Sequence, residues 1–373
     1  MDIKKFLNNA DWALIIAVCL LSVFGIICIG SATHINLGES ASNYYSQMAW
    51  FAIGIVILVF FSHINIDNVA HYYRQLYIAM LVMLLAVLIF GRSVNGAKRW
   101  IKIGPIQFQS AEPAKLAIIL FLSVLIVQFG KKLKGFKAPA VLFAFGALTF
   151  LLTWKFTENL STAIIILGIT CALIFVAHPK TAPFVLTAGI GLPVGIVGVR
   201  GYVSSLGASG NFRFNRVLAW IDPEKYSDGG GYQVLQGLYA IGSGGLFGKG
   251  LGNSTQKIQS IPEAQNDMIF SIICEELGLF GAVLLTILFV FLLYRLMFIA
   301  QNAPDLLGSL IVTGIFAHIA LQVILNIAVV LNVIPTTGVT LPFISYGGTS
   351  ILFLMTEMGI ALNVSRQIRI KDN

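Results

Sequence analysis

The residues best suited to chemistry lie between positions 241 and 279, where a glycine-rich loop precedes a single carboxylate. Six glycines between Gly242 and Gly252 permit positive φ and close approach of the main chain to a ligand. Lys249 lies within this loop, and Asp267 falls where a long apolar run begins. The loop lacks the Gly-Lys-Ser/Thr ending of a Walker phosphate loop. The pattern instead favours a carboxylate acting on a lipid-linked substrate at a membrane boundary.

A second group of ionisable residues lies between 98 and 115. Lys98, Arg99 and Lys102 cluster around Trp100 in a predicted loop, and lysine and arginine donors suit phosphate oxygens. A solvated loop that contacts phospholipid headgroups is the alternative. Glu112 and Lys115 follow at the entrance of the next apolar run, where an ionisable residue is costly and indicates function by default. They could bind a ligand, or they could simply pair with each other at i, i+3.

The sequence does not predict a metal centre or a disulfide framework. The four cysteines lie inside apolar runs without paired spacing, which is typical of small core residues. His63 and His71 are eight residues apart and have no carboxylate partner at ligand spacing.

The elements that must position these residues are membrane helices. The 373 residues are 57% hydrophobic and only 11% charged, so the chain is too apolar for one soluble domain. Because a crossing helix needs about 20 apolar residues and the apolar runs do not alternate, we predict about ten transmembrane helices and no barrel. These spans are 12–31, 47–64, 75–91, 113–130, 138–154, 159–177, 182–199, 267–295, 307–333 and 341–363.

Charge bias predicts the orientation. With both termini in the cytoplasm, 12 lysines and arginines lie on the inner side, against 6 in or beside short outer loops. The net charge of +8 is therefore explained by topology and does not indicate nucleic-acid binding. Residues 1–373 then form one integral membrane domain. Residues 200–266 form a large extracellular loop, in which 217–226 is predicted to lie amphipathically on the membrane surface.

Two further polar groups fall inside predicted helices. Glu275 and Glu276 would lie about 12–14 Å deeper than Asp267 at 1.5 Å per residue, so we expect buried acids that pair with neighbouring helices. His318, Gln322 and Asn326 recur at i, i+4 and i+8, a pattern that favours hydrogen bonds between helices, with a substrate groove as the alternative.

Four stretches in order resemble the SEDS family of bacterial cell-wall polymerases, whose members include RodA, FtsW and SpoVE. They are NGAKRWI with QSAEPAKLA, YQVLQGLYAIGSGGLFGKGLGNSTQ, IPEAQNDMIFSIICEELG and PTTGVTLPFISYGGTS. The resemblance spans almost the whole chain, with a lean toward the RodA members. One departure is Thr157 to Ala163, where many relatives carry Gln-Pro-Asp-Leu-Gly-Thr-Ala; we assign that stretch no role.

The resemblance implies an inverting peptidoglycan glycosyltransferase that polymerises lipid II at the outer face of the cytoplasmic membrane. It implies that Asp267 is the general base, that Glu112 and Lys115 are essential in the membrane cavity, and that Arg99 and Trp100 belong to an outer-loop motif. It also implies a class B penicillin-binding protein as partner, with lipid II and undecaprenyl-diphosphate-linked glycan as ligands in a bacterial membrane. No cofactor is implied, although a divalent cation could assist the pyrophosphate.

The residues support the same chemistry without the resemblance. A diphosphate leaving group gains negative charge in the transition state, so cations aimed at it accelerate departure. Lys115, Arg99 and Lys98 are the available donors, and Lys249 is a further substrate-binding candidate. Inversion needs no covalent carboxylate, which suits one prominent acid. Glu263, four residues before Asp267, is the reserve candidate for the base.

Two other function classes remain open from the residues. A transporter that flips the lipid-linked precursor would use the same cations without bond chemistry, and inverted repeats or charges at the membrane midplane would favour it. A scaffold that only recruits a transpeptidase would leave Lys115 unexplained.

Overall fold

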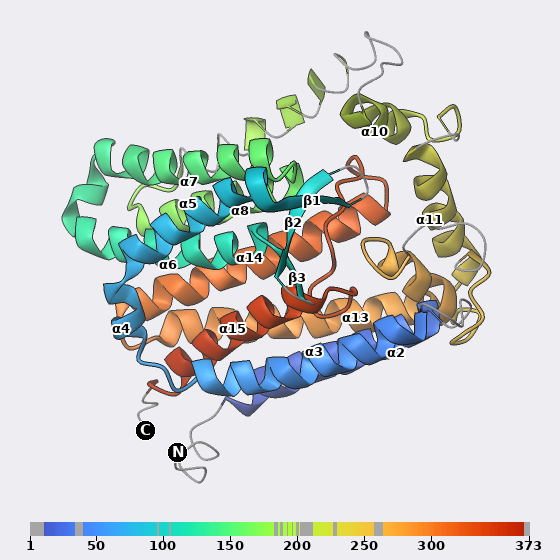
Figure 1. Ribbon diagram of the computed structural model, residues 1–373, viewed down its shortest axis with the longest axis horizontal. Helices are drawn as coiled ribbons and strands as arrows, with labels where there is room; N and C mark the ends of the chain where they lie inside the picture. The colour runs from blue at the N-terminus through green and yellow to red at the C-terminus, as the bar shows by residue number, and fades with distance from the viewer. Residues whose placement is uncertain are drawn as a thin grey trace.

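The computed structural model describes residues 11–33, 40–94, 97–103, 106–182, 212–226, 230–256 and 264–368, with scattered positions between 186 and 201. The described chain is mostly helical (Figure 1). The helices are α2 (Trp12–Thr33), α3 (Ser40–Phe61), α4 (Ile66–His71), α5 (Tyr73–Phe90), α6 (Ala111–Phe129), η1 (Gly130–Lys134), α7 (Lys137–Phe156), α8 (Leu160–Ala177), α10 (Phe212–Ile221), α11 (Gly230–Gly244), α13 (Ile269–Asn302), α14 (Leu306–Val330) and α15 (Gly348–Ser365).

The expected class, an all-helical polytopic membrane protein, is confirmed. Within the described residues, nine helices are long and apolar enough to cross a membrane. They are α2, α3, α5, α6, α7, α8, α13, α14 and α15, and each corresponds to a predicted span. The predicted span 182–199 falls where only scattered residues are described, so it is not tested. The last helix begins at Gly348 rather than at 341, because Pro342 lies in a turn that precedes it.

The centre of the bundle is formed by α6, α14 and α15, which are the most buried of the crossing helices. α14 contacts α6, α8, α13 and α15, and Figure 1 shows it running between them. Gly314 allows close contact with α6, because a Cβ there would meet the Ile119 side chain. The helices that carry the predicted site residues therefore form the core.

The two ends of the described chain meet at one end of the bundle. Asp11, just before α2, forms a 2.6 Å ion pair with Arg295 of α13 and accepts a 3.2 Å hydrogen bond from Ser365 of α15. Arg366 donates to the Ser62 carbonyl at 3.0 Å. The starts and ends of the helices thus agree with an even number of crossings.

A small sheet, which the sequence analysis did not predict, occupies the basic loop before α6. Strands β1 (Gly91–Val94), β2 (Ala97–Ile103) and β3 (Ile106–Gln109) pair antiparallel in the order β1-β2-β3. Trp100 pairs with Gln109 and Lys102 with Gln107. Because successive strand residues face opposite sides, Trp100 and Lys102 share one face and Arg99 takes the other. The expectation that these cations surround Trp100 is therefore wrong for Arg99.

The described part of the long 200–266 segment contains α10 and α11, which lie at the end of the bundle away from α4 (Figure 1). The predicted amphipathic helix, 217–226, is displaced: α10 spans Phe212–Ile221 and ends where Asp222 and Pro223 begin a turn. Trp220 donates from Nε1 to the Asn332 carbonyl at 3.1 Å. This contact ties α10 to the loop that follows α14.

Candidate functional site

Glu112 and Lys115 form a buried ion pair in the first turns of α6. Lys115 Nζ lies 3.1 Å from Glu112 Oε2, and Ser350 of α15 donates to the same carboxylate at 3.0 Å. Lys115 is only 1% exposed and Glu112 6% exposed. The mutual pair that spacing allowed is thus formed, and it is closed to solvent in this state.

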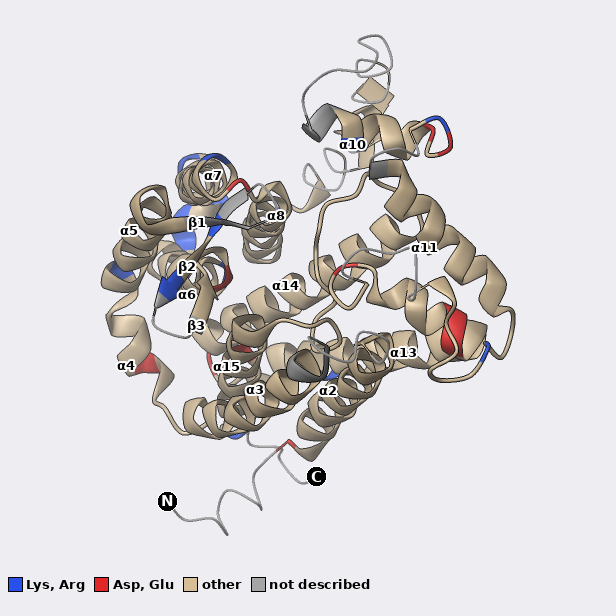
Figure 2. Cartoon of the chain, turned by 45° about the vertical axis from the view of Figure 1, so that its right-hand side comes forward, with Lys and Arg blue, Asp and Glu red and all other residues tan. Residues whose placement is uncertain are grey.

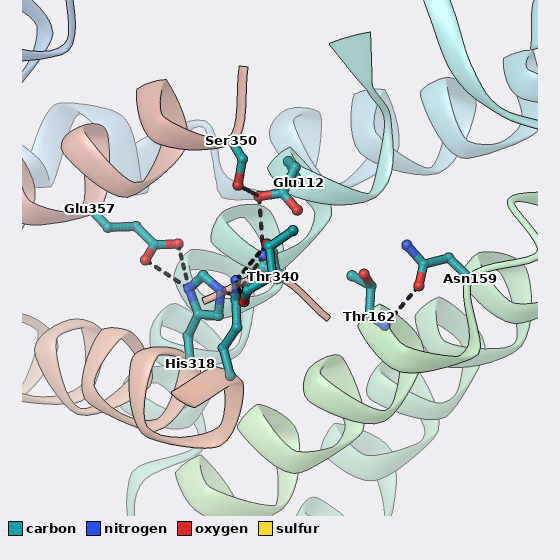
Figure 3. A network of polar contacts seen from close by, with 9 residues as sticks. Glu112, Asn159, Thr162, His318, Thr340, Ser350 and Glu357 are labelled. Atoms are coloured by element: carbon teal, nitrogen blue, oxygen red, sulfur yellow. Dashed lines mark hydrogen bonds and ion pairs between the residues drawn. The ribbon is translucent and has the colours of Figure 1, made fainter. Parts of the chain in front are cut away.

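A polar network extends from this pair through α14 into α15. Gln322 Oε1 accepts from Lys115 Nζ at 3.1 Å and lies 2.8 Å from His318 Nε2. His318 Nδ1 contacts both oxygens of Glu357, at 3.0 and 2.8 Å. Figure 3 shows Glu112, Ser350, His318 and Glu357 around Thr340, with Asn159 and Thr162 to one side. The predicted hydrogen bonds between helices are confirmed for His318 and Gln322.

Asn326, one turn beyond Gln322, connects this network to Asp267. Its Nδ2 donates to the Asp267 carbonyl at 2.9 Å and to the Val339 carbonyl at 2.7 Å. Gln322 Nε2 donates to the neighbouring Thr340 carbonyl at 3.0 Å. Two positions one turn apart on α14 therefore hold Val339 and Thr340, and one of them, Asn326, also holds the backbone of the predicted base.

Asp267 lies in the turn 264–268, just before α13, and its side chain is half-buried. Gln233 of α11 approaches Oδ1 with a long 3.5 Å contact. Gly338, with φ of 71°, faces Oδ2: a Cβ built there would lie 3.8 Å from that oxygen. The carboxylate thus lies between α11, the start of α13 and the loop after α14.

The loop after α14, residues 331–347, collects contacts from distant parts of the chain. Ser161 of α8 donates to the Thr337 carbonyl, and Arg216 of α10 reaches the Thr336 carbonyl at 3.5 Å. Tyr346 N donates to the Gln265 carbonyl at 2.9 Å. The side chain of the same residue is partly buried, and this burial raises the pKa of its phenol. This loop is therefore the element that joins α8, α10, α13 and α14 beside Asp267.

The glycine-rich loop approaches another backbone in the described structure. α13 is broken at Gly278 (φ 66°, ψ −163°), and Lys249 N and Gly250 N donate to the carbonyls of Glu275 and Glu276, both at 2.9 Å. Leu279 N donates back to Gly245 O at 2.9 Å. A Cβ at Gly248 would clash with the Glu276 carbonyl. These glycines are therefore required for docking of the loop onto the break in α13.

Lys249 forms an ion pair with Glu275. The two charged atoms lie 2.7 Å apart, and Glu275 is fully buried. Its carboxylate also accepts from Thr255 N at 3.1 Å and from the Ser254 hydroxyl. Glu276 accepts from Ser31 of α2 at 2.6 Å. Both acids have partners as expected, although those of Glu275 come from the loop. Lys249 points to Glu275, about two turns of helix from Asp267.

The other predicted site residues are less fully described. Arg99 and Trp100 lie half-buried in β2, and within the described residues no hydrogen bond or ion pair joins them to Lys115. Lys98 lies in β2 opposite Ser93, and its side chain is outside the described residues. Glu263 also lies outside them. Figure 2 shows positive charge around the sheet, whereas most of the bundle carries none.

Three residues that contact the candidate site or its supporting elements were not predicted from the sequence. Gln233 contacts Asp267, Ser350 contacts Glu112, and Asn159 caps α8 by accepting from Thr162 N at 3.0 Å. Asn159 and Ser161 lie in the stretch that departs from the family pattern, so this stretch supports the loop beside Asp267. Gln233 and Ser350 lie within the resembling motifs, but sequence spacing could not show which residues they face.

The described residues contain no group of three or more histidine, cysteine, aspartate or glutamate side chains arranged to hold a metal ion. A divalent cation would therefore need ligands from substrate or from other parts of the chain.

Sequence comparison matches residues 11–370 to the FtsW, RodA and SpoVE family model, described as a cell cycle protein. The chain is similar to stage V sporulation protein E of Bacillus subtilis, with 36% identity over 99% of this chain and 100% of that protein. It is also similar to the probable peptidoglycan glycosyltransferase FtsW of Coxiella burnetii, with 34% identity over 94% of this chain and 95% of that protein.

Two solved structures share the fold over nearly the full length. One is a chain from a study of the structural coordination of polymerization and crosslinking by a peptidoglycan synthase complex, with 27% identity, a TM-score of 0.78 and coverage of 96% of this chain and 98% of that one. The other is the rod shape determining protein RodA of Thermus thermophilus, with 26% identity, a TM-score of 0.67 and coverage of 97% and 98%.

Proposed function

The chain belongs to the FtsW, RodA and SpoVE family of cell cycle proteins, and from this membership we propose that it is a peptidoglycan glycosyltransferase. The substrate is lipid II, and the product is a glycan strand linked to undecaprenyl diphosphate. The observation that carries the proposal is full-length similarity to proteins named as peptidoglycan glycosyltransferases. The position of Asp267 between α11, α14 and the loop after α14 supports it.

Asp267 acts as the general base in this proposal. It takes the proton from the acceptor sugar hydroxyl as that oxygen attacks the anomeric carbon of the donor, and the bond from that carbon to the diphosphate breaks. One displacement inverts the configuration and needs no covalent carboxylate. The contacts from Gln233 and Asn326 support this role, because a base must be held within hydrogen-bond reach of the hydroxyl. Glu263 remains the reserve candidate.

The departing diphosphate requires cations. We assign this role to Lys115, Arg99 and Lys98. Trp100 and Lys249 are further residues that we propose to contact the substrate. In the structure, Lys115 is paired with Glu112 and Gln322, which leaves it one donor hydrogen from the three of an ammonium group. Substrate entry must therefore open the entrance of α6. A divalent cation held partly by the diphosphate would assist, and activity in the presence of EDTA tests that part.

The proposed setting is the bacterial cytoplasmic membrane, with both termini in the cytoplasm and the segment 200–266 outside. The contacts that bring the two ends of the described chain together support the part of this proposal that places both termini on the same side of the membrane. The proposed partner is a class B penicillin-binding protein that crosslinks the strands. Similarity to a chain of a peptidoglycan synthase complex supports a partner of this kind. The RodA subgroup stays a prediction, because the relatives reported above are named for sporulation and for FtsW.

One observation favours a second candidate, a flippase for the lipid-linked precursor. His318 and Glu357 form a buried ionisable pair midway along α14 and α15, and ionisable residues at the membrane midplane are common in transporters. The polymerase remains the better supported function because several similar proteins are named probable peptidoglycan glycosyltransferases.

A single reconstitution decides between the two. The full chain, with and without the transpeptidase, is placed in vesicles that contain labelled lipid II, and both glycan strands and movement of label between leaflets are measured. The proposal expects strands. Movement of label without strands under any condition would favour the flippase.

A further inference from the structure

The amide of Gln322 has only one possible orientation in the buried network. Lys115 Nζ, which can only donate, lies 3.1 Å from Oε1, and the Thr340 carbonyl, which can only accept, lies 3.0 Å from Nε2. Reversing the amide would place donor against donor and acceptor against acceptor. Gln322 is 2% exposed, so water cannot replace these partners.

This orientation determines the protonation of His318. Gln322 Oε1 can only accept, so His318 Nε2, 2.8 Å away, must carry a hydrogen. The opposite ring nitrogen, Nδ1, faces the Glu357 carboxyl at 2.8 Å, and one proton lies between them. Glu357 is fully buried and contacts no other charged group within the described residues. Within the described residues, the role of the Glu357 side chain is therefore to hold the His318 ring.

We infer that His318 and Glu357 are positioning residues for the glycosyl transfer. Glu357 holds the Nε2-protonated imidazole, and the imidazole holds the carbonyl end of Gln322. Gln322 in turn holds Lys115 and Thr340, which lies in the loop beside Asp267. Both side chains are buried, at 1% and 0% exposure, so we assign neither a contact with substrate. This inference rests on the proposed function, since it assigns the pair to the two sides of that site.

The carboxylate is not required for its charge in this arrangement. In Glu357→Gln the side-chain amide can donate to Nδ1, which preserves the Nε2-protonated ring. In Glu357→Leu the ring loses its partner and can rotate or change tautomer. A 1 Å displacement of reacting groups can reduce a rate by about 100-fold. We expect Glu357→Leu to reduce kcat for lipid II polymerisation by about 10- to 100-fold with little change in KM, and Glu357→Gln to recover most of it.

If His318 and Glu357 act together, the effects of their substitutions on kcat should not be additive. His318→Leu should reduce kcat as much as Glu357→Leu, and the double variant should be no slower than either single variant, because groups that act together are not additive. Thr356→Val is the matched control: Thr356 is also buried in α15, but its hydroxyl donates only to the Leu352 carbonyl of the same helix, at 2.8 Å. It should retain the activity of the unchanged protein.

Nitrogen NMR of ¹⁵N-histidine protein in nanodiscs tests the inference without activity. The chain has five histidines, and a His318→Gln spectrum assigns the signal. Nε2 should be protonated in the unchanged protein and in Glu357→Gln. An unprotonated Nε2 would overturn the inference, as would normal kcat in Glu357→Leu or equal losses in the Leu and Gln variants. Absence of strands from the unchanged protein would overturn the proposed function instead, and the spectrum would still decide the imidazole geometry.

Discussion

Asn326 donates from one amide nitrogen to the carbonyl of Asp267 and to that of Val339, at 2.9 and 2.7 Å. Asn326 is fully buried in α14, its bond to Val339 is buried and its bond to Asp267 is partly buried. Loss of the amide would therefore leave the Val339 carbonyl without a partner. The helix thereby fixes the spacing between the predicted base and the loop beside it.

Asn326→Leu should therefore reduce both the stability of the fold and the rate of polymerisation. The buried Val339 carbonyl loses its donor, at a cost of about 1–3 kcal/mol, and the partly buried backbone of Asp267 loses its support. We expect kcat to fall about 10-fold or more, measured at saturating lipid II. Asn302→Ala is the control, because Asn302 is exposed and donates only within its own helix. A normal kcat in Asn326→Leu would show that the backbone contact is dispensable.

Removing Lys115 alone should destabilise the protein strongly. Breaking a buried ion pair leaves an uncompensated charge and costs about 3–5 kcal/mol. Lys115→Met should thus lower the melting temperature in detergent, and Lys115→Met combined with Glu112→Gln should recover most of it.

Activity in that double variant separates two roles of Lys115. If Lys115 also stabilises the departing diphosphate, the double variant should form no glycan strands even though its melting temperature has recovered. Recovery of polymerisation together with stability would reduce Lys115 to a structural partner of Glu112.

Gly278→Ala should loosen the docking of the glycine-rich loop. Gly278 has positive φ, and a Cβ there would clash with the backbone of Leu246 and Gly248. We expect faster limited proteolysis of residues 244–256 and a lower melting temperature. Gly242→Ala is the contrast, because nothing lies near its Cβ position in α11 and alanine favours helix. Equal proteolysis rates and equal melting temperatures of the two variants would show that Gly278 is not needed for docking of the loop.

Lys249→Met tests whether its pairing with Glu275 is the main role of this lysine. The buried carboxylate keeps the Ser254 and Thr255 donors but loses its cation. We expect the loop to become sensitive to protease, and Lys249→Met with Glu275→Gln to regain resistance. A raised KM for lipid II that persists in the resistant double variant would establish the predicted substrate contact as well.

Sequence reasoning predicted the helices well because long apolar runs have few alternatives in a bilayer. It also identified Glu112, Lys115 and the stripe on α14, since polar residues in such runs need partners. It missed the sheet around Trp100, whose short strands carry little periodic signal. It interpreted the glycines after Gly242 as room for a ligand, although the described backbone uses them to meet α13. Gln233 and Ser350 depend on tertiary contacts that spacing does not encode.

The most direct test of Asp267 as the base is the initial rate of glycan strand formation by Asp267→Asn, compared with Asp222→Asn. Asp222 is exposed after α10 and only accepts from Lys225 N at 3.1 Å. Asparagine keeps the size of the side chain but cannot take a proton. We predict that Asp267→Asn folds normally and forms no strands above background, while Asp222→Asn matches the unchanged protein. Strand formation by Asp267→Asn at the unchanged rate would contradict the account.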